Sequence, residues 1–365
     1  MYDIITFGSA ALDIFLKPSD FKIIKDKKKF ITEKGICFNL GSKVDVENIF
    51  FFSGGGGTNT AATFSKQGYN VAFCGRVGDD FAGQQIINEL KDLNISCDFV
   101  SRTKEKPTNT SVVLSGLADD RTIFVYRGAS EILTKQDIPW QGLKAKWFYL
   151  APLSGKLSEV FDYIIDFASQ NNIKVAVNPG NTQLSYPIEK LAKILKKVDI
   201  LILNEEEASL LTGIPLYEKN ETRAPILKKI GARPSTQSAE SGMSALVFKK
   251  IDEICPGIAI MTKGQEGVVV SDGKYIYKSK AQDIKIVDGT GAGDSFASGF
   301  LSEYIRTNDI EQSIQLGIAN SASCLKKWGA KNGLLEKEEK FPKTDIRKEE
   351  CKENNICKTK SNNSK

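Results

Sequence analysis

Histidine is absent from the 365 residues of this chain, and its absence removes a whole set of catalytic mechanisms. Ser-His-Asp triads, imidazole proton shuttles and the metal sites that use imidazole ligands all require it. Any acid–base chemistry must therefore fall to carboxylates, lysine, tyrosine or cysteine.

Long apolar runs and paired cysteines are also missing. No stretch approaches the roughly 20 apolar residues that span a bilayer, and the N-terminus has no signal-peptide pattern, so we expect a cytoplasmic protein with no membrane partner. The seven cysteines are an odd number without any C-x-x-C, which indicates neither a disulfide framework nor a zinc site. The net charge of +5 does not require a nucleic-acid partner.

Two common glycine-rich nucleotide motifs are absent as well. The pattern G-x-x-x-x-G-K-[ST] does not occur. The pattern G-x-G-x-x-G fails at both candidate loops, because Asp294 and Thr60 stand where the third glycine is required. A P-loop enzyme or a standard dinucleotide dehydrogenase is therefore not expected.

The most informative stretch present is Asp288-Gly-Thr-Gly-Ala-Gly-Asp-Ser-Phe296, in which a glycine-rich turn leads into an apolar helical run. Its small residues let the backbone N–H groups of Gly291, Ala292 and Gly293 converge on one point, where the helix dipole favours an anion. An isolated glycine-rich turn is more often a simple turn, and Asp294 in a purely structural role would be a helix N-cap. A carboxylate beside an anion site favours a chemical role instead.

The rest of the chain alternates between strand and helix patterns, which predicts a mostly parallel sheet covered on both faces. The chain is long enough for one large α/β domain or two smaller ones. Short apolar runs predict strands at residues 4–7, 71–73, 147–150, 173–177, 200–203 and 258–261. Periodic patterns predict helices at residues 81–93, 157–169, 205–212, 293–304 and 310–326.

Several segments depart from this alternation. Residues 14–52 and 110–126 are β-rich and predict a small antiparallel lid, in which the lysine run at 25–29 is interpreted as a solvated turn rather than a phosphate-binding segment. Residues 219–250 read as an insertion of one helix and a loop. From Glu336 to Lys365 charge is high and apolar content low, which predicts a polar, disordered tail.

The motifs, taken together, resemble those of the ribokinase-like (PfkB) family of carbohydrate and nucleoside kinases. The family's C-terminal signature reads like DTxGAGDxF, and this chain has DGTGAGDSF. The segment from Gly54 to Asn59 resembles the N-terminal signature, Asn204-Glu-Glu-Glu207 resembles an N-x-x-E element, and residues 262–267 resemble a nucleotide loop. These motifs span roughly residues 1–333.

The resemblance implies a ribokinase-like three-layer α/β fold over residues 1–335, with the β lid covering a sugar. It also implies ATP and Mg²⁺ as cofactors, and it leaves open a K⁺ requirement and a homodimer formed through the lid.

Catalytic and nucleotide-binding roles follow from the same resemblance. Asp294 would be the catalytic base, and the backbone of Gly291, Ala292 and Gly293 would form the anion hole. Nucleotide contacts would come from Asn204, Thr262, Gly264, Gly267, Gly291 and Gly293. Asn204 and Glu207 would bind Mg²⁺ through water, with helix capping as the simpler alternative, whereas Glu205 and Glu206 are expected at the surface.

The acceptor side is inferred in the same way. Asp13 would accept hydrogen bonds from sugar hydroxyls, and Gly55 and Asn59 match positions that approach the same substrate. Asp288 and Thr290 match a monovalent-cation site, although acidic and hydroxyl residues beside a turn commonly just close it.

Departures from the ribose-phosphorylating members concern this acceptor side. Where those members have Asn, Lys and Glu, the chain has Ala11, Gly56 and Ala151, so ribose is in doubt as the acceptor. Arg127 is a candidate for binding an acidic group on the acceptor, or equally for an ordinary salt bridge of the lid.

The sequence thus predicts an ATP-dependent phosphotransferase that acts on a sugar hydroxyl, as a ribokinase or fructokinase does. A nucleoside kinase of the same fold is the alternative from the same class, and a catalytically silent sugar- or nucleotide-binding regulator is the alternative from another class.

Overall fold

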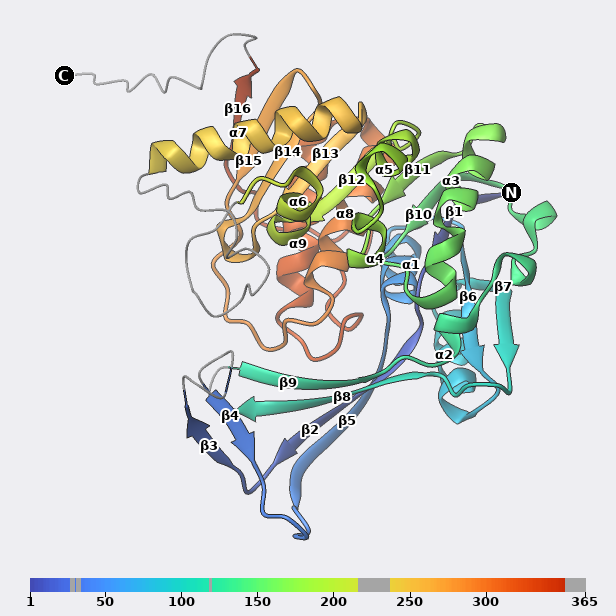
Figure 1. Ribbon diagram of the computed structural model, residues 1–365, viewed down its shortest axis with the longest axis vertical. Coiled ribbons are helices and arrows are strands. Elements are labelled where there is room, and N and C mark those ends of the chain that lie inside the picture. The colour runs from blue at the N-terminus through green and yellow to red at the C-terminus, as the bar shows by residue number, and fades with distance from the viewer. Residues whose placement is uncertain (27–29, 31–33, 118–119, 216–236, 352–365) are drawn as a thin grey trace.

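The structure is a computed structural model, and it describes residues 1–26, 30, 34–117, 120–215 and 237–351. Over these residues the chain folds into three layers, with a large sheet between two sets of helices and a smaller sheet extending from one edge (Figure 1). This is the α/β architecture that the alternation of strand and helix patterns predicts.

The large sheet is parallel in its main part and antiparallel at one end. From one edge of the sheet, the first seven strands (β7, β6, β1, β10, β11, β12 and β13) pair in parallel with their neighbours. The last three strands (β14, β15 and β16) continue the sheet in antiparallel pairs. In order across the sheet, the strands are β7 (Ser96–Thr103), β6 (Val71–Gly78), β1 (Tyr2–Phe7), β10 (Ala145–Leu150), β11 (Lys174–Val177), β12 (Ile200–Asn204), β13 (Ile258–Thr262), β14 (Val268–Ser271), β15 (Tyr275–Ser279) and β16 (Ile346–Glu350). The six strands predicted from apolar runs are all present in it.

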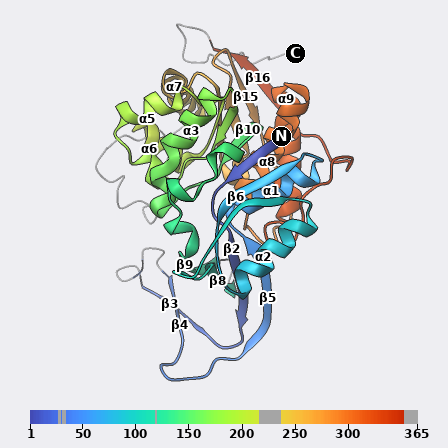
Figure 2. The ribbon, with the colours of Figure 1, turned by 90° about the vertical axis from the view of Figure 1, so that its right-hand side faces the viewer.

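Two hydrophobic cores flank this sheet, because its strands carry apolar side chains on both faces. One face packs against α3 (Phe161–Gln170), α5 (Ile188–Leu195), α6 (Glu205–Thr212) and α7 (Gln237–Ile254). The other face packs against α1 (Gly56–Lys66), α2 (Phe81–Asp92), α8 (Ala292–Thr307) and α9 (Ile310–Cys324). Figure 2 shows these two groups on opposite sides of the sheet. Among the described helices, none has the length and apolar character needed to span a membrane.

The lid is a separate sheet of four strands in the order β5, β2, β8 and β9, and it projects from the main body in both ribbon views (Figures 1 and 2). Its strands are β2 (Ala11–Pro18), β5 (Val46–Gly54), β8 (Asn109–Leu117) and β9 (Asp120–Tyr126), and a hairpin of β3 (Lys22–Lys25) and β4 (Lys34–Cys37) lies beside them. The predicted antiparallel arrangement is only partly correct, because β2 and β8 pair in parallel. These two strands leave the main sheet separately, one after β1 and one after β7, so they run in the same direction.

Two predicted segments fall partly outside the described residues. Residues 27–29 of the lysine run and residues 219–236 of the insertion lie outside them, whereas Lys25 is exposed at the end of β3. The helix expected in the insertion is α7 (Gln237–Ile254), which packs into the core through Val247, Phe248 and Ile251.

The expectation of disorder from Glu336 onward is wrong for residues 336–351. The chain there forms β16, which pairs with β15 along its whole length, and Gln315 of α9 holds Thr344 by a 2.8 Å hydrogen bond from the Thr344 N–H. Ile346 also packs against the second core. The strand pairs with β15 through its backbone, and the amino-acid composition of a segment does not indicate backbone pairing. Residues 352–365 lie outside the described residues.

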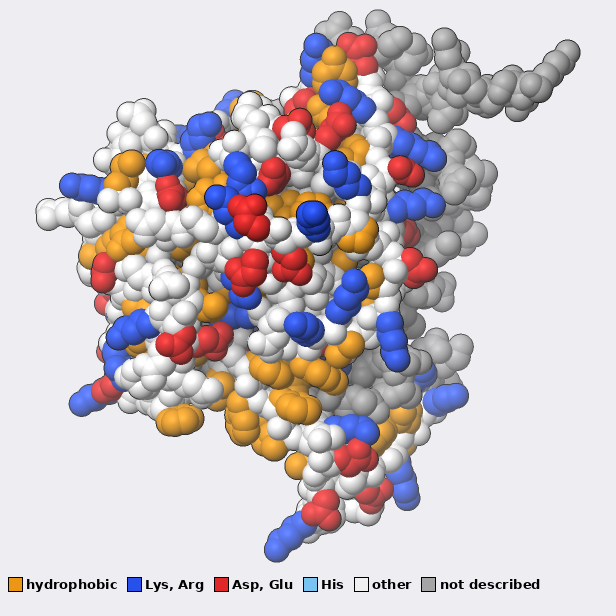
Figure 3. All heavy atoms as spheres, turned by 180° about the vertical axis from the view of Figure 1, so that it is seen from behind, with side chains coloured by type: hydrophobic (Ala, Val, Ile, Leu, Met, Phe, Trp, Pro, Cys, Tyr) orange, Lys and Arg blue, Asp and Glu red, His pale blue; other side chains and the backbone are white. Residues whose placement is uncertain are grey.

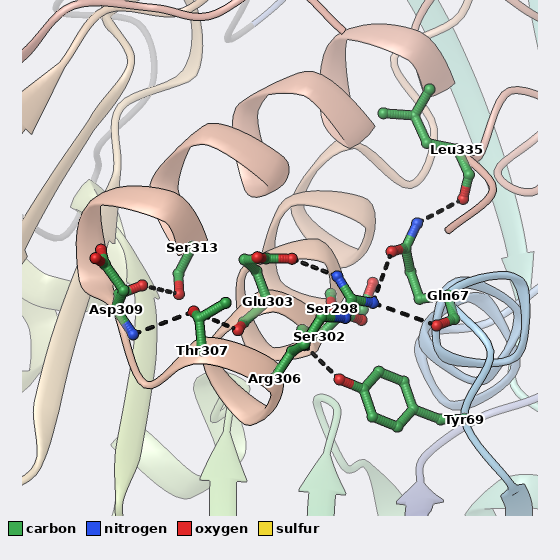
Figure 4. Close-up of polar contacts among 10 residues, drawn as sticks. All are labelled: Gln67, Tyr69, Ser298, Ser302, Glu303, Arg306, Thr307, Asp309, Ser313 and Leu335. Atoms are coloured by element: carbon green, nitrogen blue, oxygen red, sulfur yellow. Dashed lines mark hydrogen bonds and ion pairs between the residues drawn. The ribbon is translucent and has the colours of Figure 1, made fainter. Parts of the chain in front are cut away.

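Helix α8, which carries the glycine-rich turn at its N-terminus, is fixed at its other end to the segment that follows α1 (Figure 4). The Tyr69 hydroxyl donates to the Ser302 carbonyl at 2.6 Å, and Arg306 donates to both the backbone and the side-chain oxygen of Gln67. Burial raises the pKa of Tyr69 to about 12, so this donor keeps its proton at physiological pH. The contacts set the position of the whole helix, and therefore of its first turn.

Candidate active site

The predicted site residues gather where several parallel strands end. Strands β1, β10, β12 and β13 run in the same direction, so their carboxyl ends share one edge of the sheet. Ala151 follows β10, Asn204 ends β12 and Thr262 ends β13. Ligands of open α/β sheets bind beyond this edge, and the lid strand β2 begins there as well.

The glycine-rich turn has the geometry of an anion site. Gly291 adopts the left-handed conformation with φ of 77°, and a Cβ there would lie 2.5 Å from the Ala330 Cβ, so only glycine fits. The N–H groups of Gly291, Ala292, Gly293 and Asp294 donate to no acceptor within the described residues. Unbonded donors at a helix N-terminus are free to bind a negatively charged ligand.

Asp294 is not the N-cap of α8. That position belongs to Gly291, and the Asp294 carboxylate instead accepts a 2.8 Å hydrogen bond at Oδ2 from Nδ2 of Asn59. Burial raises the pKa of Asp294, while the bond from Asn59 and the positive charge of Lys331 oppose the rise. A carboxylate with a raised pKa accepts a proton more readily, as a general base must.

Two buried polar atoms in this region have no partner among the described residues: Oδ1 of Asn59, whose amide group holds the Asp294 carboxylate, and the hydroxyl of Tyr149. Burial raises the pKa of Tyr149 well above its ordinary value, and the negative charges of Asp294 and Glu207 add to the effect. Unsatisfied buried polar atoms are costly, so both atoms are suited to bind a ligand group or an ordered water. Nothing in the sequence distinguishes Tyr149 as a site residue, because it stands within the apolar strand pattern of β10.

The acceptor-side residues lie next to the predicted base. A Cβ on Gly56 would be 2.9 Å from the Ala151 Cβ and 3.5 Å from Oδ1 of Asp294, so these three residues are neighbours. Gly55 has φ of 95°, and a Cβ on it would lie 2.5 Å from the Ser9 carbonyl oxygen. Because the residues from Gly54 to Gly57 have no side chains, their backbone can lie close to Asp294 and Ala151.

Asp13 lies on lid strand β2 and is buried, with Gly54 packed directly against its carboxylate. Burial raises its pKa, while a hydrogen bond from Ser111 and the charges of Lys331 and Arg121 lower it. The structure thus places a carboxylate between the lid and the glycine-rich segment, where the sequence analysis expects a sugar hydroxyl to bind.

Lys331 is a site residue that the sequence analysis missed. Its side chain is almost fully buried, contacts Ser53, and lies 3.4 Å from Oε1 of Glu89. Burial lowers its pKa, and the carboxylates of Glu89, Asp13 and Asp294 oppose that change. In the sequence it follows Lys326 and Lys327, which are exposed, so nothing distinguishes it from a surface lysine.

Asn204 and Glu207 form a capping box at the start of α6. The Asn204 Oδ1 accepts from the Glu207 N–H, and the Glu207 Oε2 accepts from the Asn204 N–H, both at 2.8 Å. Burial raises the pKa of Glu207. Its second oxygen, Oε1, accepts no hydrogen bond from any residue that the structure describes. That oxygen is free to accept a hydrogen bond from a metal-bound water, so the pair fits a hydrated Mg²⁺ as well as the capping role.

Of the two neighbouring glutamates, only Glu206 is exposed as expected. Glu205 is buried, with its carboxylate 3.4 Å from Nζ of Lys263, so its assignment to the surface is wrong. The ion pair joins the start of α6 to the loop after β13. These two segments are far apart in the sequence, so local sequence patterns do not predict the contact.

The expected nucleotide loop lies at this same strand edge. Thr262 ends β13, and a short 3₁₀ turn at Gly264–Glu266 follows. Gly264 has φ of 55° and Gly267 has φ of 103°, and a Cβ on Gly267 would overlap the Ser279 carbonyl oxygen. Both glycines are therefore required by the backbone of the loop.

The two side chains assigned to a monovalent-cation site are bonded to an arginine of the lid. Nη1 of Arg121 donates to Oδ1 of Asp288 at 3.0 Å and to Oγ1 of Thr290 at 2.9 Å. The residues present in this arrangement do not fit a bound cation, because a guanidinium already occupies their oxygens. Arg127, the other lid arginine considered, is exposed and makes no hydrogen bond or ion pair within the described residues.

A cavity of about 880 Å³ lies at the opposite edge of the sheet. Lys174, Asp199 and Ile258, which stand at the starts of β11, β12 and β13, line part of it. It contains none of the predicted site residues and is not the candidate active site.

Comparison with known protein families decides the assignment of this site. The family model described as pfkB family carbohydrate kinase matches residues 30–337. This chain belongs to the pfkB family of carbohydrate kinases. It is therefore a phosphotransferase that binds ATP, and its acceptor is a sugar or a nucleoside.

Relatives within the pfkB family differ in their acceptors. The chain is 24% identical to a ribokinase of Haemophilus influenzae over 301 residues, which cover 82% of this chain and 89% of that protein. It is 27% identical to a cytidine kinase of Thermococcus kodakarensis over 284 residues, which cover 76% and 88% of the two chains. Identities this low leave the acceptor of the present kinase open.

Solved structures of pfkB kinases share its fold. An Arabidopsis thaliana ribokinase complexed with ribose and ATP matches with a TM-score of 0.70 and 22% identity, covering 92% of this chain and 96% of that one. A putative ribokinase II from E. coli in complex with ATP and Mg²⁺ matches with a TM-score of 0.68 and 18% identity over the same shares. The ribokinase-like fold, with its large sheet and smaller β lid, is thereby confirmed.

Proposed function

We propose that this kinase transfers the γ-phosphoryl group of ATP to a hydroxyl of a sugar, with Asp294 as the general base. The observation that carries the proposal is the placement of Asp294. Its carboxylate is held by Asn59, has a raised pKa, and stands in the turn whose N–H groups bond to none of the residues that the structure describes.

In this reaction the acceptor hydroxyl loses its proton to Asp294 as its oxygen forms the new bond to phosphorus. The bond between the γ-phosphorus and the bridging oxygen breaks, and ADP leaves. The N–H groups of Gly291, Ala292 and Gly293 would stabilise the charge on the transferring group, which is typically worth about 3 kcal/mol for each such donor. A positioned base contributes on the order of 10²–10⁴-fold in rate.

Mg²⁺, when bound with ATP, neutralises charge on the phosphates. Asn204 and Glu207 would hold its hydration shell, with Oε1 of Glu207, which bonds to no described residue, accepting from a water. The nucleotide itself would lie along the loop from Thr262 to Gly267, which the ion pair of Glu205 and Lys263 ties to the start of α6.

The acceptor site supports relaxed specificity. Ala11, Gly56 and Ala151 present no side-chain hydrogen-bonding group, so an acceptor that lacks a given hydroxyl leaves few buried partners unsatisfied. Asp13 is the polar group that remains on the lid side, where it would bind two neighbouring hydroxyls of the acceptor.

The test is ADP release with a panel of pentoses, hexoses, keto-deoxy acids and nucleosides. We expect turnover of several acceptors that share a primary hydroxyl and a vicinal diol. Turnover of free ribose alone would contradict the proposal. In the same assay, Asp13→Ala should raise the KM of every acceptor far more than the KM of ATP, and an unchanged acceptor KM would remove Asp13 from the site.

A nucleoside acceptor is the second candidate. The apolar surface of Ala151 next to Gly56, with Ala11 paired to Gly54 beside it, suits the flat face of a base better than a ring of hydroxyls, and one relative is a cytidine kinase. Within the panel, nucleosides with a kcat/KM at least about tenfold above that of any free sugar would establish this alternative, a difference of about 1.4 kcal/mol in transition-state binding. A silent regulator would bind both ligands and release no ADP.

A homodimer through the lid completes the proposal. The lid exposes apolar side chains on two of its strands, including Ile49, Phe50 and Phe51 of β5 and Phe124 and Val125 of β9. Figure 3 shows hydrophobic side chains gathered over this part of the molecule. Exposed apolar patches of this kind mark interaction surfaces. Sedimentation of the protein and of Phe51→Glu should give a dimer and a monomer respectively, and a monomeric parent protein would exclude the dimer.

A further inference from the structure

Arg121 connects the lid to the signature turn of the main domain. It lies near the start of β9, and its Nη1 donates to Oδ1 of Asp288 and Oγ1 of Thr290 at 3.0 and 2.9 Å. The Asp288 side chain is 3% exposed, whereas that of Arg121 is 37% exposed. The guanidinium therefore approaches from the solvent side and covers a carboxylate that is otherwise buried.

Both oxygens of the Asp288 carboxylate accept hydrogen bonds in this arrangement. Oδ1 also accepts from the N–H and the hydroxyl of Thr290 at 3.0 and 2.8 Å, and Oδ2 accepts from the N–H of Gly329 at 3.0 Å. The Thr290 hydroxyl donates to Asp288, and its oxygen accepts from Arg121. A monovalent cation at these oxygens would have to displace the guanidinium, because two positive charges at contact distance repel each other.

Gly289 lies in contact with the arginine. A Cβ on Gly289 would lie 3.5 Å from both Nη1 and Nη2 of Arg121, so the guanidinium rests over the backbone of the turn. The signature that the chain resembles has threonine at this position. The methyl and hydroxyl groups of a threonine would extend beyond this Cβ. Some of the threonine rotamers would point toward the guanidinium, so the side chain would be restricted to the rotamers that point away from it. The glycine and the arginine are thus compatible features of one local structure.

We propose that the Arg121 guanidinium takes the place of a monovalent cation at Asp288 and Thr290. It supplies in the chain itself the positive charge that orders the turn leading to Gly291, and it couples the position of the lid to that turn. The protein consequently needs no K⁺, and K⁺ binds there only when the guanidinium is removed. The part of this proposal that concerns turnover rests on the proposed function, whereas the part that concerns cation binding does not.

A nearby carboxylate is consistent with this placement of charge. Burial is the main influence on the pKa of Asp13 and raises it, and among the opposing influences is the positive charge of Arg121. The same guanidinium therefore acts on the turn that binds phosphate and on the carboxylate proposed to bind the acceptor.

Thermal unfolding without substrates tests cation binding directly. The melting temperature is measured in KCl and in choline chloride at equal ionic strength, for the parent protein and for Arg121→Gln. The parent protein should melt at the same temperature in both salts. Arg121→Gln should melt roughly 2 °C or more higher in KCl, because a ligand that binds only the folded state stabilises it.

Arg102→Gln is the matched control, since it removes an arginine of similar exposure from an ion pair with Asp79 at 2.8 Å. It should show no preference for KCl. ADP release provides a second measurement, in which K⁺ should raise the rate of Arg121→Gln at least about threefold, a change of roughly 0.65 kcal/mol or more, and leave the parent rate unchanged.

Each of three results would overturn the proposal: a parent protein that KCl stabilises relative to choline, an Arg121→Gln variant without any response to K⁺, or a control that responds as Arg121→Gln does. The first result is decisive even when Arg121→Gln does not fold. Because the melting experiment contains no ATP and no acceptor, its outcome is separate from whether the protein is a sugar kinase.

Discussion

At the scale of single residues, Asp294 is the group on which turnover should depend most. Asp294→Asn keeps the size of the side chain but cannot take the acceptor proton, so kcat should fall at least about 10²-fold. Steady-state ADP release measures kcat, and equilibrium titration measures ATP affinity, which should be retained. Asp162→Asn, which removes a carboxylate from the first turn of α3 in the opposite layer, is the matched control. A near-parental kcat for Asp294→Asn would exclude the base assignment.

Lys331 should set the pH range in which that base works. Its positive charge lowers the pKa of Asp294 and of Asp13 against the stronger effect of burial. In Lys331→Met both pKa values should rise further, so the acid limb of the pH profile of kcat/KM should move to higher pH. Rates at mildly acidic pH should fall more than rates at alkaline pH. The exposed Lys327→Met serves as the control, and an unmoved acid limb in Lys331→Met would rule out the electrostatic role.

A site residue can be predicted from the sequence when its contacts are with residues nearby in the chain. Asp294, Gly291 and Asn204 belong to short motifs whose geometry is local, and the structure brings them to one strand edge. Arg121 contacts Asp288 across 167 positions, and Lys331 meets Ser53 across 278. No local pattern distinguishes such residues from surface charges, because their partners are fixed only when the lid and the main sheet have formed.

At the scale of secondary-structure elements, two glycines at the start of α8 that look equivalent in the sequence differ in their backbone conformation and surroundings. Gly291 has φ of 77° and its Cβ would overlap Ala330, whereas a Cβ on Gly293 would meet nothing within 4 Å. Gly291→Ala should lower the free energy of unfolding by at least about 2 kcal/mol. Gly293→Ala should change it by less than about 1 kcal/mol, in the stabilising direction, because alanine favours a helix.

Urea unfolding of the two variants checks this pair, each acting as the control for the other. Equal losses of stability would mean that the turn does not have the described backbone. The pattern of apolar residues predicts the extent of α8 to within a few residues, but it contains no information on which glycine has a positive φ.

The elements of the main sheet are predictable to the degree that their strands are continuously apolar. The apolar strands of the parallel part were found from composition, since both faces of these strands are buried. Strand β16 was not found, because it is a polar edge strand whose pattern resembles a solvated tail. The parallel pairing of β2 with β8 also lay beyond the sequence, since it depends on which strand of the main sheet each one follows.

At the scale of the whole molecule, the stability of the sheet edge should depend on the C-terminal segment. A chain that ends at Thr344 lacks β16, which leaves unpaired the edge of β15 that does not pair with β14 and removes the packing of Ile346. Its melting temperature should fall by roughly 3 °C or more. A chain that ends at Cys351 keeps β16 and is the control. Equal melting temperatures for the two truncated chains would show that β16 adds no stability.

The position of β16 has a consequence for biosynthesis. A ribosome releases this chain from its N-terminus onward, so the ten-stranded sheet can be completed only after residue 350 has left the exit tunnel. Until then the nascent protein presents β15 as an open edge to other nascent chains and to chaperones. The interval between the emergence of β15 and the emergence of β16 is thus the time during which this edge of the sheet is open to aggregation, and slow translation between the two strands would lengthen it.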